Sequence, residues 1–258
     1  MAISEYSYPL PEKYWFKDLG FVNYPTKKER TGHNIGIVHP GLFFAKRFPK
    51  NPRMLDSLSS PVARELSGIM GQDMVLVELV NEWHTNMAIA STARALKEIT
   101  DPKKTVFVKV LRGAEEYYQK LRGYLPGLIR DDNTQSVRVE RTHGGKLGDI
   151  TFEKDFDPAA IAGKSLMLIE DMGDQNLTLR RIVDQALGYE AASVGVAIEF
   201  NKLDVSGKLV LPEVQVVGFG MVDKWMGGEG ADFQQELGRK MPGVWIQMPR
   251  DEYLVLVS

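Results

Sequence analysis

The 258-residue sequence contains no cysteine. Disulfide bonds, thiolate metal sites and cysteine nucleophiles are therefore excluded. Histidine is scarce as well, because the chain has four His residues, and they are scattered rather than set at the spacing of a zinc site. The sequence thus gives no sign of thiol chemistry or of a histidine-bound metal.

Long apolar runs and an excess of one charge are also lacking. No apolar stretch approaches the roughly 18 residues of a membrane-spanning helix, and the start of the chain, Met1–Tyr6, is more polar than a signal peptide. Lys and Arg number 32 against 34 Asp and Glu, so no overall charge draws the chain to nucleic acid or to an anionic membrane. We therefore expect a cytoplasmic protein with neither nucleic acid nor a membrane as partner.

The first sixty residues differ from the rest. They are rich in proline and aromatic residues, lack a clear period, and carry nine basic and five acidic residues, a net charge of +4. Trp15, Phe16, Phe43 and Phe44 are too apolar for a free tail, so we expect this segment to pack on the core or on a partner subunit. The length fits one large domain with an extension. We predict an N-terminal extension over residues 1–60 and a single domain over residues 61–258.

Residues 165–188 are the stretch around which the rest of the chain is interpreted. Leu166–Ile169 is a short uncharged apolar run, which predicts a strand buried on both faces. Thr178 stands where a side chain caps a first helical turn, and Gly188 where a left-handed residue ends a helix. Between them the period becomes helical, with an expected buried stripe of Leu179, Ile182, Val183, Ala186 and Leu187.

Three acids, Glu170, Asp171 and Asp174, lie between this strand and this helix. Ionised carboxylates are costly to desolvate, so they seldom serve packing at the end of a buried strand. Open α/β sheets bind ligands at that end, and the free N–H groups of a helix N-terminus bind phosphate. The turn is therefore a candidate site for a polyhydroxylated, phosphorylated molecule. The alternative is an ordinary loop with capping acids, but the adjacent pair Glu170-Asp171 directly after four apolar residues favours a ligand site.

The segment Ile169–Thr178 resembles the phosphoribosyl-pyrophosphate (PRPP) loop of the type I phosphoribosyltransferases. In the hypoxanthine-guanine branch that loop usually reads Val-Glu-Asp-Ile-Ile-Asp-Thr-Gly-Lys-Thr, and the three acids and the final Thr match in register. Gln175, Asn176 and Leu177 stand where the family has Thr-Gly-Lys. The missing Gly bears on phosphate affinity because this loop brings its backbone close to the 5′-phosphate. Asn176 tolerates left-handed backbone better than most residues.

Two earlier segments resemble the family in the same order. Leu111-Arg112-Gly113 follows an expected strand and is similar to the pyrophosphate loop, which usually reads Leu-Lys-Gly. Residues 142–146 stand where the family has a mobile loop carrying a Ser-Tyr pair, with Thr142-His143 in its place. Neither segment is specific alone; their order along residues 90–250 is what carries weight.

Three later segments extend the resemblance. Lys202, just past the carboxyl end of an expected strand over residues 193–200, stands where the family's Lys donates to the 6-oxo group of the purine. Asp223 ends a segment similar to Val-Val-Gly-Tyr-Gly-Leu-Asp, with one extra residue before the Asp, and Arg239 begins one similar to Arg-Asn-Leu-Pro. Gln215 replaces the stacking aromatic, for which Trp225 is a candidate substitute.

The resemblance implies an α/β fold with a mostly parallel central sheet flanked by helices, a small hood and an N-terminal extension. It implies transfer of 5-phosphoribose from PRPP to a purine-like base, with release of pyrophosphate, Mg²⁺ as cofactor, and a homodimer or homotetramer. Lys202 indicates a 6-oxopurine, because an ammonium donates hydrogen bonds and accepts none. A different class remains open: a PRPP- or purine-sensing regulatory protein that uses the same fold without catalysis.

The implied site residues fall into five groups. Asp174 is the catalytic group that handles the proton on the base. PRPP is assigned to Glu170, Asp171, Asp174, Gln175, Asn176, Leu177 and Thr178. Pyrophosphate is assigned to Arg112, Gly113 and Arg239, and the base to Lys202, Met172 and Val216. The metal ligands are Asp223, Glu170 and Asp171.

Overall fold

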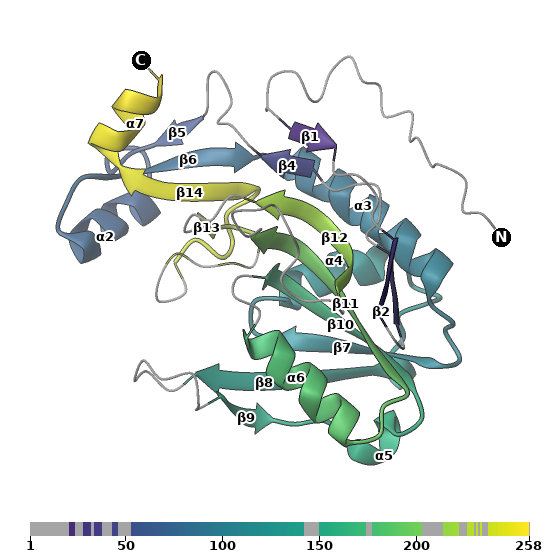
Figure 1. The fold of residues 1–258 in the computed structure, drawn as a ribbon. Coiled ribbons are helices and arrows are strands. Elements are labelled where there is room, and N and C mark those ends of the chain that lie inside the picture. The colour runs from purple at the N-terminus through teal and green to yellow at the C-terminus, as the bar shows by residue number, and fades with distance from the viewer. Residues whose placement is uncertain are drawn as a thin grey trace.

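The computed structural model describes residues 53–141, 150–173, 177–202, 214–221, 226–229, 231, 233 and 237–257, together with four short strands between residues 21 and 45. Within these residues the chain forms an eight-stranded sheet, a four-stranded sheet and a two-stranded ribbon. The large sheet has the order β1-β4-β12-β11-β10-β7-β8-β9. Helices flank it, and the smaller sheet lies at one end (Figure 1).

The centre of the large sheet consists of five mutually parallel strands. In spatial order these are β12 (Val214–Met221), β11 (Ser193–Lys202), β10 (Ser165–Gly173), β7 (Thr105–Leu111) and β8 (Thr134–Arg141). The antiparallel strand β9 (Ile150–Lys154) ends one edge. Their apolar runs without alternation, such as Leu166–Ile169, suit strands covered on both faces.

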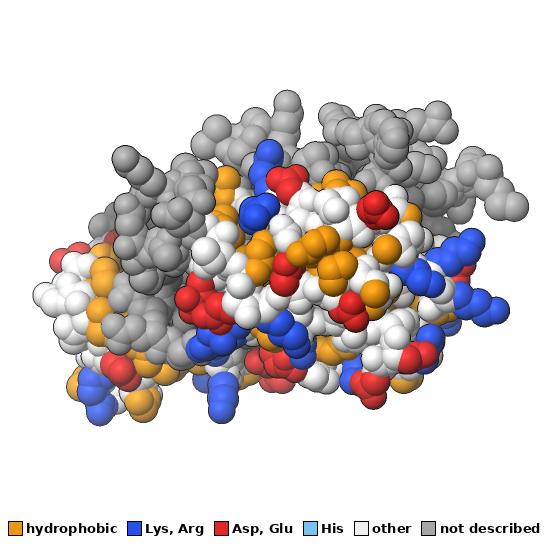
Figure 2. All heavy atoms as spheres, turned by 90° about the horizontal axis from the view of Figure 1, so that it is seen from below, with side chains coloured by type: hydrophobic (Ala, Val, Ile, Leu, Met, Phe, Trp, Pro, Cys, Tyr) orange, Lys and Arg blue, Asp and Glu red, His pale blue; other side chains and the backbone are white. Residues whose placement is uncertain are grey.

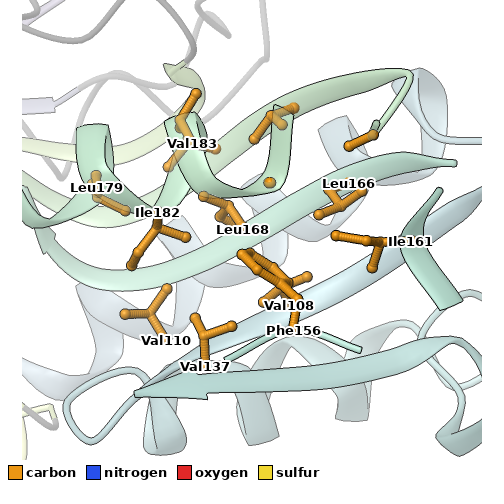
Figure 3. Close-up of a cluster of buried hydrophobic side chains, with 14 of the residues drawn as sticks. Val108, Val110, Val137, Phe156, Ile161, Leu166, Leu168, Leu179, Ile182 and Val183 are labelled. Atoms are coloured by element: carbon orange, nitrogen blue, oxygen red, sulfur yellow. The ribbon is translucent and has the colours of Figure 1, made fainter. Parts of the chain in front are cut away.

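Two helical layers cover the two faces of this sheet (Figure 1). On one face, α6 (Leu177–Gly188) and the short α5 (Pro158–Ile161) pack on the strands through a buried cluster that includes Val108, Leu168 and Ile182 (Figure 3). On the other face, α3 (Glu82–Ile99) and α4 (Glu115–Tyr124) pack through a second cluster that includes Ile89, Phe107 and Tyr117. The amphipathic stripes of α6 and α3 thus explain the three-layer arrangement.

A separate small sheet forms the hood. It has the order β13-β14-β6-β5, built from β5 (Met54–Leu55), β6 (Met74–Val80), β13 (Met226–Gly227) and β14 (Val244–Pro249). The helices α2 (Pro61–Met70) and α7 (Arg250–Val257) accompany it. Phe200 of β11 is buried in the hood's apolar cluster, and Met172 of β10 packs against that cluster. The hood therefore sits on the carboxyl ends of the central strands.

Residues of the N-terminal segment pair with the large sheet and the hood sheet, and they also form the two-stranded ribbon. β4 (Phe43–Ala45) pairs in parallel with β12, and β1 (Phe21–Asn23) pairs with β4. β2 (Lys28–Thr31) and β3 (Asn34–Ile37) form the ribbon. The boundary of the N-terminal extension at residue 60 stays a prediction. β5 lies before that boundary, and it pairs with β6 of the hood sheet.

The structure confirms the predicted α/β fold and corrects several local predictions. Gly188 is the last residue of α6 and is not left-handed; the positive φ falls at Glu190 (φ 61°). Leu187, expected in the buried stripe, is 48% exposed because it lies at the rim of the α6 contact. Thr178 is the second residue of α6 rather than a residue preceding it, since the helix begins at Leu177. Lys202 is the last residue of β11, not one past its end, because pairing with β12 continues to Met221.

One face of the molecule is mixed in charge. On the face shown in Figure 2, basic and acidic side chains are interspersed, with apolar side chains among them. Among the described helices, none is long and apolar enough to cross a membrane.

Candidate functional site

The carboxyl ends of the parallel strands bring the predicted segments to one edge of the sheet. β10 ends at Gly173, β7 at Leu111, β11 at Lys202 and β12 at Met221. Because these strands are parallel and adjacent, the acidic turn, the Arg112-Gly113 turn and Lys202 share that edge. Three predicted elements lie outside the described residues: Asp174–Asn176, residues 142–149 and Asp223 with Trp225.

The acid pair occupies the end of β10. Asp171 is 7% exposed, and Glu170 precedes it directly in the strand. Burial, followed by the charge of Asp171, raises the pKa of Glu170 well above its ordinary value. Two adjacent carboxyl groups at a strand end can accept hydrogen bonds from vicinal hydroxyl groups or hold a hard cation.

Gly113 lies directly against this acid pair. A methyl group in place of its hydrogen would stand 2.2 Å from Asp171 Oδ2 and 2.5 Å from Oδ1. Only glycine allows the turn after β7 to approach the carboxylate so closely. The peptide bond before Arg112 in the same turn is cis, and the Arg112 side chain is exposed. Two segments about sixty residues apart in the sequence therefore form one surface.

The N-terminus of α6 follows the acidic turn. Its first turn contains no acidic residue, and Leu177 and Thr178 are both partly buried. The free N–H groups of a first helical turn carry a positive partial charge. This end of α6 can therefore receive a phosphate group beside the acid pair.

The three residues assigned to the base are placed differently. Met172 packs against the hood cluster, beside the acid pair. Val216 is buried between the sheet and α3, with 1% of its surface exposed, so its side chain belongs to the core. Lys202 is placed at the end of β11 by its backbone, whereas its side chain lies outside the described residues.

Arg239 lies in the hood, in a turn over residues 237–240 that precedes β14, and it is partly exposed. Within the described residues, no group of three or more His, Asp or Glu side chains is arranged to hold a metal ion. The assignment of Mg²⁺ to Glu170, Asp171 and Asp223 stays a prediction.

Comparisons with known proteins support the resemblance. No family model matches the chain. A hypoxanthine-guanine phosphoribosyltransferase of Streptococcus pyogenes serotype M3 is 24% identical over 166 residues, 62% of this chain and 88% of that protein. That of Streptococcus agalactiae serotype V is 28% identical over 146 residues, 56% of this chain and 77% of that protein.

A solved hypoxanthine phosphoribosyltransferase from Staphylococcus aureus superimposes with a TM-score of 0.58 at 22% identity, covering 67% of this chain and 92% of that one. One from Trypanosoma cruzi in complex with the product IMP gives 0.57 at 18% identity, covering 67% and 94%. This chain has the type I phosphoribosyltransferase fold. It is similar to the hypoxanthine-guanine members, as the motifs in the sequence predicted.

The interior of this phosphoribosyltransferase fold contains a polar cluster that the motifs did not reveal. Glu199 and Asn201 of β11 are 1% and 0% exposed, and no side-chain partner is found for either carboxylate oxygen or for the amide. Glu199 lies level with Asp171, because Glu170 pairs with Ile198 and Met172 with Phe200. The sequence did carry a signal: Glu199 is a charged residue directly after the uncharged run Val194–Ile198.

Burial raises the pKa of Glu199 well above its ordinary value, and the charge of Glu229 raises it further while Lys120 opposes the shift. The folded state therefore binds a proton that the unfolded state releases. The associated stability is present below the unfolded pKa and is lost as the pH rises through the folded pKa.

Glu199→Gln should accordingly be more stable than the wild type at about pH 8, and this difference should shrink towards about pH 5. Thermal unfolding at several pH values measures it, with a gain of about 2–4 °C in midpoint for each kcal/mol. The exposed Glu98 of α3 provides the control, since Glu98→Gln should leave the pH profile unchanged. An equal loss of stability at all pH values would contradict the assignment of Glu199 as a buried neutral acid.

Proposed function

We propose that this chain transfers 5-phosphoribose from PRPP to a ring nitrogen of a purine base, releasing pyrophosphate. The observation that carries the proposal is the acid pair Glu170-Asp171, set at the end of a central parallel strand, against Gly113, and before the N-terminus of α6. A ribose with two free hydroxyls, a 5′-phosphate and a pyrophosphate presents groups that match these three features. The names of the relatives agree with this reaction class.

Each segment then has a distinct role. Glu170 and Asp171 accept hydrogen bonds from the ribose hydroxyls, and the first turn of α6 with Thr178 receives the 5′-phosphate. Arg112 and Arg239 neutralise the charge that develops on the leaving pyrophosphate as the anomeric carbon becomes oxocarbenium-like. Asp174 is proposed to manage the proton of the imidazole ring of the base.

Magnesium fits the donor set. The carboxylates of Glu170 and Asp171, with Asp223, would hold it together with the phosphate oxygens of PRPP. When bound, the ion supplies charge stabilisation to the departing pyrophosphate.

The direct experiment incubates the protein with PRPP, Mg²⁺ and single bases and measures pyrophosphate. Base-dependent release of pyrophosphate is the expected result. Binding of PRPP or of a purine without turnover would instead identify a sensor that uses the same fold. Absence of both binding and turnover would refute the proposal.

The base itself is proposed to carry a 6-oxo group, selected by Lys202. An ammonium group donates to a carbonyl oxygen but cannot accept from an exocyclic amine. Turnover on hypoxanthine or guanine should therefore exceed turnover on adenine by on the order of a hundredfold, because adenine leaves a polar group unpaired. Lys202→Ala should remove most of this preference. Efficient use of adenine by the wild type, or unchanged 6-oxopurine activity in the variant, would show that Lys202 does not select the base.

A further inference from the structure

One buried carboxylate joins the hood to the core. Glu229 follows β13, has a positive φ of 50°, and is 1% exposed. Its Oε1 accepts hydrogen bonds from Thr85 Oγ1 of α3 at 3.2 Å and from the Gly243 amide at 2.7 Å. Its Oε2 accepts from Lys120 Nζ of α4. Both carboxylate oxygens are thus satisfied by partners from three different parts of the chain.

Residues 228–229 and 241–243, near the two ends of the stretch between β13 and β14, meet at Glu229. Gly228 has a φ of 99°, and a Cβ there would stand 2.0 Å from the Gly243 carbonyl oxygen. The Glu229 amide donates to the Met241 carbonyl oxygen at 3.1 Å. Residues 228–229 are therefore held against residues 241–243. Arg239 lies in the turn over residues 237–240, directly before the second of these segments.

Lys120 connects this loop to the other candidate pyrophosphate segment. α4 begins immediately after the Arg112-Gly113 turn, and Lys120 lies on its second turn. Burial lowers the pKa of Lys120, but the hydrogen bond and charge of Glu229, with the charges of Glu116 and Glu199, outweigh it, so the net shift is upward. The pair therefore ties the segment of Arg239 to the segment of Arg112 and Gly113.

Stability alone gives a weak reason for such a pair. The Glu229 side chain is 1% exposed and that of Lys120 26%, and desolvation of such groups offsets most of the attraction between their charges. A fixed geometry is what this pair adds, because both carboxylate oxygens of Glu229 accept hydrogen bonds. In the proposed reaction, the segments that contain Arg112 and Arg239 both have to face the leaving pyrophosphate. The pair of Lys120 and Glu229 joins these two segments.

We propose that Glu229 and Lys120 are positioning residues for pyrophosphate. They hold the Arg239 loop of the hood at a set distance from the Arg112-Gly113 turn, and they do not touch the substrate. This inference rests on the proposed phosphoribosyl transfer.

The test compares Lys120→Met and Glu229→Gln with the wild type, measuring kcat, the KM for PRPP, the KM for hypoxanthine and pyrophosphate binding by calorimetry. The KM for PRPP and the Kd for pyrophosphate should rise on the order of tenfold to a hundredfold, as expected for a displacement of about 1 Å. The KM for hypoxanthine should stay within about twofold, since the base meets other residues. Lys120→Arg should restore most of the loss because it keeps the charge.

The matched control is Glu116→Gln. Glu116 Oε1 lies 3.5 Å from Lys120 Nζ, and its side chain is 41% exposed, so the variant removes the outer partner and leaves the buried pair. It should change neither the KM for PRPP nor the Kd for pyrophosphate. If the wild type transfers phosphoribose and the two buried-pair variants keep its PRPP and pyrophosphate affinities, the positioning role is refuted while the function stands. If the wild type shows no transfer, the function fails, and the calorimetry with pyrophosphate alone still decides whether the pair shapes an anion site.

Discussion

The double variant Glu170→Gln, Asp171→Asn is expected to lose PRPP binding and phosphoribosyl transfer together. These two acids are adjacent at the end of β10, and Asp171 is the one that Gly113 lies against. Loss of a single preorganised electrostatic contact costs about 10²–10³ in rate. Replacing both carboxyl groups with amides should therefore bring activity below detection.

The fold should tolerate this change. Burial raises the pKa of Glu170, so its surroundings already disfavour the charged form and should accept a neutral amide of the same shape. Isothermal calorimetry with PRPP and Mg²⁺, together with thermal unfolding, measures both effects. Asp131→Asn with Asp132→Asn is the matched control, because this adjacent acidic pair is 85% and 72% exposed and precedes β8 at the opposite edge of the sheet. Unchanged PRPP affinity in the Glu170-Asp171 variant would remove these residues from the site.

Gly113→Ala is the second variant with a large expected effect. The new methyl group would overlap the Asp171 carboxylate at 2.2 Å, so either the turn or the acid has to move. A displacement of about 1 Å at a reacting site costs on the order of a hundredfold in rate. Steady-state kinetics should show kcat/KM for PRPP falling by at least that factor.

Gly123 offers the control within the same region. It lies in α4, and a Cβ there meets nothing within 4 Å. Gly123→Ala should leave the kinetics unchanged and stabilise the helix by up to about 1 kcal/mol. If Gly113→Ala were as active as Gly123→Ala, the contact between the turn and the acid pair would have no part in catalysis.

Local patterns in the sequence determined much of the fold and the location of the site. The uncharged run Leu166–Ile169 and the helical period that follows it predicted β10 and α6, because buried strands and amphipathic helices have distinct apolar spacings. The acids at the end of that run indicated the ligand edge, since parallel strands present their carboxyl ends together. The order of the motifs predicted the fold that the structural comparisons confirm.

The ends of helices and strands were harder to predict from the sequence. Lys202 lies inside β11 and Gly188 inside α6 because strand pairing and helix packing, rather than local propensity, decide where each element stops. The individual roles of the site residues remain predictions. Their positions at one edge are established only for the described members.

Tertiary structure alone decided which distant groups touch. The hood is assembled from residues 54–80 and 226–249, which carry no shared motif, and strand pairing brings them together. In the sequence Glu229 is one charged residue in a glycine-rich stretch, yet it is buried against Lys120, 109 positions earlier. Gly113 reads as a turn residue until the Asp171 carboxylate is found beside it. A pattern along the sequence shows which face of an element is apolar. Contacts between elements depend on how those faces pack, and this packing gives the acid pair, the pyrophosphate turn and the buried ion pair their geometry.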